Sequence, residues 1–288
     1  MPLALLLLAI LLLGVSAGAL GSMLGLGGGL VIVPGLVLFF DVPVPLAIAA
    51  SLVSIIATSA GSASRYAAKG LLHLRLGFFL EVGTALGGLT GAALTASVLQ
   101  SGTGTKVLVL AFSVVAVSAA YLLYRDLRRG EFVPPPPDPL ADRWRLHGTL
   151  PADSGQPARP FRVGRVREGL ALSFVAGLAS GLLGIGGGTY KVPAMSGVMG
   201  VPIKMATATS SLMIGVTATA GALVYLVHGD VLPLIAAPVA VGTLLGSHVG
   251  TSLHARTTSV GLRWIFLVVL MAAAFLMAAR AILGVPWA

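Results

Sequence analysis

The chain of 288 residues is 57% hydrophobic and only 9% charged, with a mean hydropathy of +0.99. Soluble globular proteins carry roughly a quarter charged residues, so this composition excludes a soluble enzyme and predicts an integral membrane protein. The formal net charge of +9 does not indicate nucleic-acid binding, because half of the basic residues lie in one segment, 125–167. The chain has no cysteine, which excludes disulfides and thiolate metal sites.

The first predicted element is an apolar run from Leu3 to Leu13 that leads into a glycine cluster at 25–29. The run lacks the positively charged start of a signal peptide and its later part recurs downstream, so we expect it in the mature protein. Three uninterrupted apolar spans follow, at about 43–66, 76–99 and 105–124. Their hydrophobicity does not alternate as in a barrel strand, which predicts transmembrane helices.

Residues 125–167 interrupt the apolar pattern. This segment holds nine arginines, five acidic residues and four consecutive prolines, Pro134 to Pro137. Such a composition is typical of a flexible linker. Its positive charge predicts that it faces the cytoplasm, close to anionic lipid head groups.

The rest of the chain repeats the first part. A second glycine cluster at 184–188 is followed by spans at about 202–227, 232–253 and 262–282, and an offset of 159 residues aligns the two halves without a gap over about eighty positions. This register predicts an all-α polytopic membrane protein built from two copies of one unit. We assign the first repeat to 1–124, the linker to 125–167 and the second repeat to 168–288.

Each glycine cluster predicts a break in a helix. In the second unit, about fifteen residues separate the linker from Gly181, where we expect the first arm to end, and about a dozen separate Gly188 from Gly200. Both arms are too short to cross a hydrocarbon core of about 30 Å, so we expect two half-helices that meet in a re-entrant or broken segment. Lys69 in the 66–75 loop and Arg256 in the 254–263 loop place both loops in the cytoplasm. The second unit then runs opposite to the first, as in inverted-repeat transporters; a parallel duplication is the alternative.

The breaks have the chemistry of an anion site. A helix that starts at a glycine presents unpaired backbone N–H groups and a positive dipole end, and glycine lets an oxyanion approach closely. The alternative is that the glycines only permit tight packing around a kink. Neither cluster ends in Gly-Lys-Ser or Gly-Lys-Thr, so a nucleotide P-loop is excluded. The glycines expected to bind an anion are Gly25, Gly27, Gly28, Gly29, Gly184, Gly186, Gly187 and Gly188.

Five further side chains are candidates for the site. Lys191 neutralises the bound anion or else snorkels to the surface. Ser51 and Ser210 occupy equivalent positions and line a hydrated path, unless they only mediate close helix packing. Glu81 and His248 are candidates for carrying a coupled proton, the alternative being that both lie in the cytoplasmic interface.

The two signatures are Gly-Leu-Gly-Gly-Gly-Leu-Val-Ile-Val-Pro at 25–34 and Gly-Ile-Gly-Gly-Gly-Thr-Tyr-Lys-Val-Pro at 184–193. Together with the small-residue helices at 83–91 and 242–250, they resemble the TauE/SafE family, also called the toluene-sulfonate uptake permease family. The resemblance covers nearly the whole chain except the linker. It implies a carrier in the bacterial inner membrane for sulfur-containing anions such as sulfite or organosulfonates.

We therefore predict a secondary transporter, most simply an exporter, that binds its anion where the two breaks meet and works by alternating access. We expect no catalytic residue, cofactor or metal, and the small anion and the lipid bilayer as partners; the oligomeric state stays open. One alternative is a sodium- or proton-coupled cation antiporter, which needs an acidic residue at the break. Another is a membrane scaffold that exposes the linker to a partner.

Overall fold

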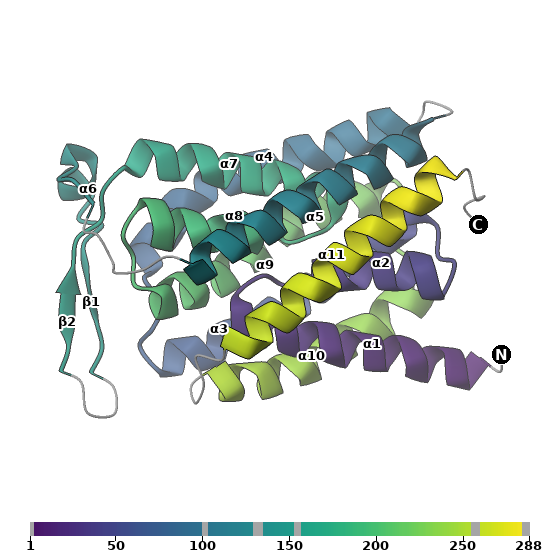
Figure 1. Cartoon of the computed structure of the whole chain (residues 1–288), viewed down its shortest axis with the longest axis horizontal. Helices are drawn as coiled ribbons and strands as arrows, with labels where there is room; N and C mark the ends of the chain where they lie inside the picture. Colours follow the sequence, from purple (N-terminus) through teal and green to yellow (C-terminus); the bar gives the residue numbers. More distant parts are fainter. Residues whose placement is uncertain (1–2, 100–102, 129–134, 153–156, 255–259, 284–288) are drawn as a thin grey trace.

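The computed structural model describes residues 3–99, 103–128, 135–152, 157–254 and 260–283 and is almost entirely helical (Figure 1). The first unit contains α1 (Leu3–Leu24), α2 (Gly29–Phe39), α3 (Val44–Ala68), α4 (Leu74–Leu99) and α5 (Gly104–Arg128). The second contains α7 (Val166–Leu183), α8 (Gly188–Pro193), the π-helical turn η1 (Ala194–Val198), α9 (Ile203–Val227), α10 (Pro233–His254) and α11 (Val260–Ile282). Between them lie α6 (Pro139–Arg143) and a hairpin of β1 (Gly148–Leu150) and β2 (Arg159–Phe161).

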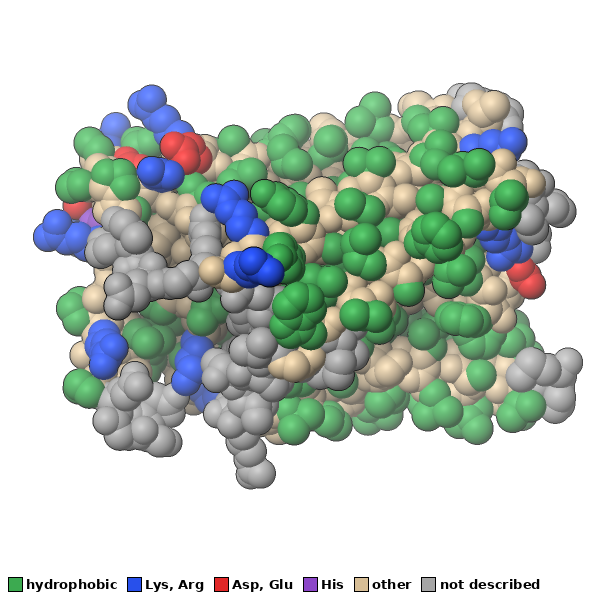
Figure 2. All heavy atoms as spheres, in the orientation of Figure 1, with side chains coloured by type: hydrophobic (Ala, Val, Ile, Leu, Met, Phe, Trp, Pro, Cys, Tyr) green, Lys and Arg blue, Asp and Glu red, His purple; other side chains and the backbone are tan. Residues whose placement is uncertain are grey.

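The membrane class is confirmed. Seven of the described helices are long and apolar enough to cross a bilayer. Exposed apolar side chains cover the middle of the molecule and the charged groups gather towards its two ends, as Figure 2 shows for one face. The outward faces of α4 and α10 illustrate this pattern, with exposed Phe78, Val82, Leu86, Val241, Leu245 and Val249. The chain is therefore a multi-pass helical membrane protein.

Five of the six predicted spans correspond to helices that are long enough to cross a bilayer, namely α3, α4, α5, α9 and α10, and the sixth corresponds to α11. The structure contradicts the predicted length of the arm that precedes the second break. The arms that precede the breaks, α1 with 22 residues and α7 with 18, are both long and apolar enough to span. Helix α7 runs through Gly181 because this glycine packs against α4 and does not end the helix: a Cβ there would lie 2.0 Å from the Gly88 carbonyl oxygen. The arms that follow the breaks are short, 11 residues in α2 and 6 in α8.

The two units interlock through equivalent helices. Helix α1 of the first unit packs along α10 of the second, and α7 of the second packs along α4 of the first. Small residues allow these close approaches. A Cβ at Gly87 on α4 would lie 2.2 Å from the Phe174 carbonyl oxygen, and one at the equivalent Gly246 on α10 would lie 2.1 Å from the carbonyl oxygen of Val15.

Helices α3 and α9 occupy equivalent positions in the repeat and pack against each other. Ser59 Oγ donates to the Ser211 carbonyl oxygen at 2.7 Å, while earlier in α3 the Leu52 side chain would lie 3.3 Å from a Cβ at Gly221, later in α9. The contacts thus run in opposite directions along the two helices, so α3 and α9 are antiparallel. This pairing favours inverted repeats over a parallel duplication.

The described part of the linker is folded, in contrast to the flexible tether that its composition predicts. Its few apolar side chains, among them Leu146 and Phe161, are buried in a cluster with Leu76 of α4 and Met205 of α9. His73, just before α4, packs its ring edge-on against Phe161. The linker therefore covers the ends of α4 and α9. Arg256, used to orient the 254–263 loop, lies outside the described residues.

Candidate functional site

The first helix break is built by three glycines with left-handed backbone angles. Helix α1 ends at Leu24, and Gly25, Gly27 and Gly28 have φ of 70°, 87° and 79°. L-residues with a side chain rarely adopt this region, so the turn requires glycine. Two of the N–H groups in the break are bonded to the last turn of α1, because Leu26 N and Gly27 N both donate to the Gly21 carbonyl oxygen, at 2.8 and 3.3 Å. Helix α2 then begins at Gly29.

The second break repeats this geometry at the equivalent residues. Gly184, Gly186 and Gly187 have φ of 68°, 79° and 67°, and α8 begins at Gly188. Gly184 N donates to the Ser180 carbonyl oxygen at 2.8 Å. The structure thus contains both breaks that the sequence predicts, each followed by a short apolar helix.

The two breaks lie directly against each other. A Cβ at Gly29 would be 2.2 Å from the Gly184 carbonyl oxygen, and one at Gly188 would be 2.2 Å from the carbonyl oxygen of Gly25. We call this contact the crossing. Gly29 and Gly188 leave no space for a side chain between the two units, whereas Gly28 and Gly187 pack against α1 and α7 of their own units.

The two predicted serines hold the crossing together. Ser51 Oγ on α3 donates to the Gly184 carbonyl oxygen at 2.6 Å, and Ser210 Oγ on α9 donates to the carbonyl oxygen of Gly25 at 2.8 Å. Both serines are fully buried, and each binds the break of the other unit. Because a hydroxyl has one hydrogen to donate, both are engaged with carbonyl groups here. Anion binding by the serines stays a prediction.

A buried polar cluster lies beside the second break. Lys191 on α8 is buried and does not reach the surface, which excludes snorkelling. Its Nζ donates to Thr217 Oγ1 on α9 at 2.6 Å, and Thr217 Oγ1 in turn lies 2.6 Å from Glu81 Oε1 on α4. Lys191 Nζ also lies 3.5 Å from Glu81 Oε2. We call Lys191, Thr217 and Glu81 the charged triad.

The two proton-carrier candidates lie in different surroundings. Glu81 is 6% exposed and belongs to the charged triad, whereas His248 is on the exposed face of α10. The Nδ1 atom of His248 lies 2.9 Å from the carbonyl oxygen of Leu244 in its own helix, and Arg65 Nη1 donates to its backbone oxygen. Only Glu81 is therefore placed where its charge contacts Lys191. Among the described residues, no group of three or more His, Asp or Glu side chains could hold a metal ion.

Three buried hydroxyls of the second unit were not predicted as site residues; two lie next to the second break, and Ser173 lies about three helical turns earlier in α7. Ser173 and Ser180 on α7 and Thr189 at the start of α8 are buried, and within the described structure their oxygen atoms have no hydrogen-bond partner. The repeat contains a signal for them, since the equivalent first-unit residues are Gly14, Gly21 and Leu30. Buried hydroxyls without partners are costly, so they indicate a place where a polar ligand or water binds.

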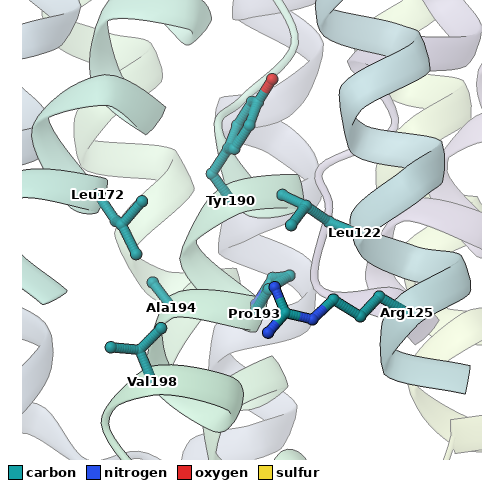
Figure 3. A pocket seen from close by; sticks show the side chains of 7 residues that line it. All are labelled: Leu122, Arg125, Leu172, Tyr190, Pro193, Ala194 and Val198. Carbon is teal, nitrogen blue, oxygen red and sulfur yellow. The ribbon is translucent and has the colours of Figure 1, made fainter. Parts of the chain in front are cut away.

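A pocket of about 190 Å³ is lined by Tyr190 and Pro193 of α8, and Lys191 does not line it. Arg125 extends into it from α5 towards α8 and η1, opposite apolar side chains from α7 and η1 (Figure 3). Of the seven residues that line the pocket, Arg125 alone is charged. The lining residues are Leu122, Arg125, Leu172, Tyr190, Pro193, Ala194 and Val198.

Comparisons with known proteins give the family. Residues 10–277 match the model of the family described as sulfite exporter TauE/SafE. The chain is 31% identical over 254 residues to the probable membrane transporter protein YunE of Bacillus subtilis (strain 168), covering 86% of this chain and 88% of that protein.

A second relative in Bacillus subtilis (strain 168), the probable membrane transporter protein YdhB, is 25% identical over 246 residues, covering 85% of this chain and 88% of YdhB. No solved structure matches the chain. Family and relatives are described as membrane transporters and not as enzymes. The match over most of the length, on a helical membrane fold with two crossed breaks, shows that the chain belongs to the sulfite exporter TauE/SafE family of membrane transporters.

Proposed function

We propose that the chain is a secondary transporter of small sulfur-containing anions, such as sulfite or organosulfonates, which bind beside the second break. The observation that carries this proposal is Lys191, a buried cation three residues after the start of a glycine-led helix. A charge buried in a membrane-spanning region is unfavourable, so its presence indicates a functional role. The family description supports the sulfur-containing class.

The surroundings of Lys191 favour an anion over a cation. The unpartnered hydroxyls of Ser180 and Thr189 lie in the same part of the chain as Lys191, and hydroxyl donors and a cation both stabilise negative charge. A cation carrier requires a carboxylate that is available to the ion. Glu81 is instead paired with Lys191, which makes the sodium- or proton-coupled antiporter the weaker candidate.

The geometry of the crossing also suggests how access alternates. The two breaks are too closely packed for an anion to lie between Gly29 and Gly184, since even a Cβ would lie 2.2 Å from the Gly184 oxygen. The anion therefore binds beside the crossing and not within it, and antiparallel α3 and α9 provide the interface along which the units rock.

We propose an inner-membrane location with the linker in the cytoplasm. Lys69 and Arg65, which lie at the end of α3, contact backbone oxygens at the end of α10. The linker lies at the same end of the molecule, because the His73 ring is 3.3 Å from the His147 carbonyl oxygen. The clustering of positive charge at this end supports a cytoplasmic face.

The test is flux into proteoliposomes that contain the full chain. Radiolabelled sulfite is supplied outside, and unlabelled sulfite, sulfate, taurine, sulfoacetate or sodium chloride is added as competitor. We expect uptake above that of protein-free liposomes, reduced by sulfur oxyanions and not by sodium chloride. The Asp41→Asn variant, altered at the opposite end from the linker, serves as a matched control that keeps the flux. Sodium flux without sulfite flux would reject the proposal in favour of the antiporter.

A further inference from the structure

We propose that Glu81 and the transported anion compete for Lys191, so that an anion binds only when Glu81 has taken up a proton, and one proton travels with each anion. This inference rests on the proposed function and adds its coupling. The proton comes from the water on the side where the site is open and is released on the other side. Lys191 stays charged throughout.

The geometry of the charged triad matches such a competition. Lys191 Nζ bonds Thr217 Oγ1 at 2.6 Å and lies 3.5 Å from Glu81 Oε2. This carboxylate oxygen is buried and has no hydrogen-bond partner within the described structure. The distance from Glu81 Oε2 to the Lys191 ammonium group is longer than that of a good hydrogen bond. An oxyanion that forms a shorter bond to Lys191 can therefore replace Glu81 as its partner.

Charge balance requires the proton. Lys191 neutralises one negative charge, and two anions in the same buried space would leave one of them uncompensated. The elements packed against α4 are α5, α7 and α9, and those around α8 are α5, α7, α9 and η1. Among the described side chains of these elements, Lys191 is the titratable group that contacts Glu81. Nearby Tyr190 bonds Ser118, and Glu168 on α7 pairs with Arg165 in the linker.

The repeat itself shows that the charges are not needed for packing. The first-unit residue equivalent to Lys191 is Ile32, and the second-unit residue equivalent to Glu81 is Ala240. The symmetric position therefore lacks both charges. Of the charged triad it retains only the threonine, as Thr58, which is equivalent to Thr217. A buried ion pair is commonly replaced by apolar residues without loss of stability. The same unit thus folds with an apolar pair, and the charged pair is kept for another purpose.

The position of the pair couples it to movement of the units. Glu81 belongs to the first unit and Lys191 to the second, so their contact joins the two units close to the crossing. Neutralising Glu81 weakens this connection at the moment when an anion replaces it at Lys191. Proton uptake, anion binding and release of the first unit from the second then become one event.

The experiment measures anion flux and proton movement in the same proteoliposomes. Methanesulfonate is used beside sulfite, because a sulfonate stays ionised and any proton that moves with it is carried by the protein. Flux is followed with radiolabelled anion and internal pH with a trapped dye. In the wild-type protein, we expect methanesulfonate uptake to acidify the lumen and to rise as the external pH falls.

Two variants separate the roles. Glu81→Gln is expected to carry the anion without acidification and with flux that no longer depends on pH. Lys191→Met is expected to reduce the flux at least tenfold. Because Lys191→Met leaves Glu81 buried without its partner, the double variant Glu81→Ala/Lys191→Ile, which copies the first unit, is made as well; it should unfold at the wild-type temperature and carry no anion.

The outcomes distinguish failure of this inference from failure of the proposed function on which it rests. If the wild-type protein carries neither anion, the proposed function fails. If it carries them without acidification, or if Glu81→Gln keeps the wild-type pH dependence, the proposed function stands and the competition is refuted. Wild-type coupled flux in the folded double variant would likewise overturn it.

Discussion

Replacing Gly188 with alanine tests the closeness of the crossing. The added Cβ would lie 2.2 Å from the Gly25 carbonyl oxygen and 2.7 Å from the Leu26 Cα. To restore even a 3.0 Å contact, the carbonyl must move by 0.8 Å (3.0 minus 2.2). It cannot do so freely, because it accepts the 2.8 Å hydrogen bond of Ser210. The methyl group therefore forces backbone of the first unit away from the second.

The expected cost follows from these contacts. Overpacking of a tight interior costs about 1 to 3 kcal/mol, and weakening the Ser210 hydrogen bond adds about 1 kcal/mol. Alanine recovers at most about 1 kcal/mol through its helix propensity, since Gly188 lies in α8 and its φ is not left-handed. The balance is a net destabilisation of roughly 1 to 3 kcal/mol.

The assay is thermal unfolding of the purified protein in detergent, together with anion flux. Gly261→Ala is the matched control, because a Cβ at this helical glycine meets nothing within 4 Å. We expect Gly188→Ala to unfold at a lower temperature and to lose flux. Gly261→Ala should keep the flux and unfold at the wild-type temperature or slightly above it. Equal unfolding temperatures for Gly188→Ala and the wild-type protein would refute the close packing of the breaks.

Three further predictions concern single polar contacts. Ser51→Ala removes the donor to the Gly184 oxygen and should cost about 1 to 3 kcal/mol in detergent unfolding; a neutral effect would contradict a role in holding the crossing. Asp138 accepts from Val166 N and Leu140 N. These bonds, foremost the one from Val166, lower the pKa of Asp138 below its ordinary 3.8. The ionised carboxylate therefore stabilises the fold fully above pH 3.8, and this stabilisation is lost as the pH falls further. Asp138→Ala should cost about 1 kcal/mol and remove this acid sensitivity; an unchanged acid profile would contradict the role of Asp138. Asp41→Asn removes the negative charge from the 2.7 Å pair with Arg280 and should change stability by less than about 1 kcal/mol. Asparagine also tolerates the left-handed φ of 49° at this position. A larger loss would show that the pair is not a surface contact.

Much of the fold could be predicted because it depends on local pattern. The apolar spans, the constant offset of 159 residues and the glycine clusters each follow from sequence alone. The left-handed turns at Gly25 and Gly184 follow as well, since only glycine adopts that backbone region at little cost. The same reasoning failed for Gly181, because a helical glycine that packs against another helix and one that ends a helix have the same signature in the sequence.

The charged triad and the folded linker could not be predicted, because both depend on contacts between distant segments. Glu81 and Lys191 are 110 residues apart (191 minus 81), and only the packing of α4 and α9 around α8 brings them together. The linker has too few apolar residues to fold alone. It folds because Leu146 and Phe161 are buried against α4 and α9, whose apolar side chains complete the cluster.

The contrast between the two breaks locates the chemistry. In backbone geometry they are nearly identical, and each accepts a serine from the other unit, so the crossing itself is symmetric. Beside the second break, however, the first-unit residues Ile32, Leu30 and Gly21 are replaced by Lys191, Thr189 and Ser180. Thr217, in contrast, has a polar equivalent in the first unit, Thr58. Symmetric contacts explain how two copies assemble and move, but they give no reason for one-sided polarity. The proposed ligand site beside α8, which lies off the symmetry axis, accounts for this one-sided polarity.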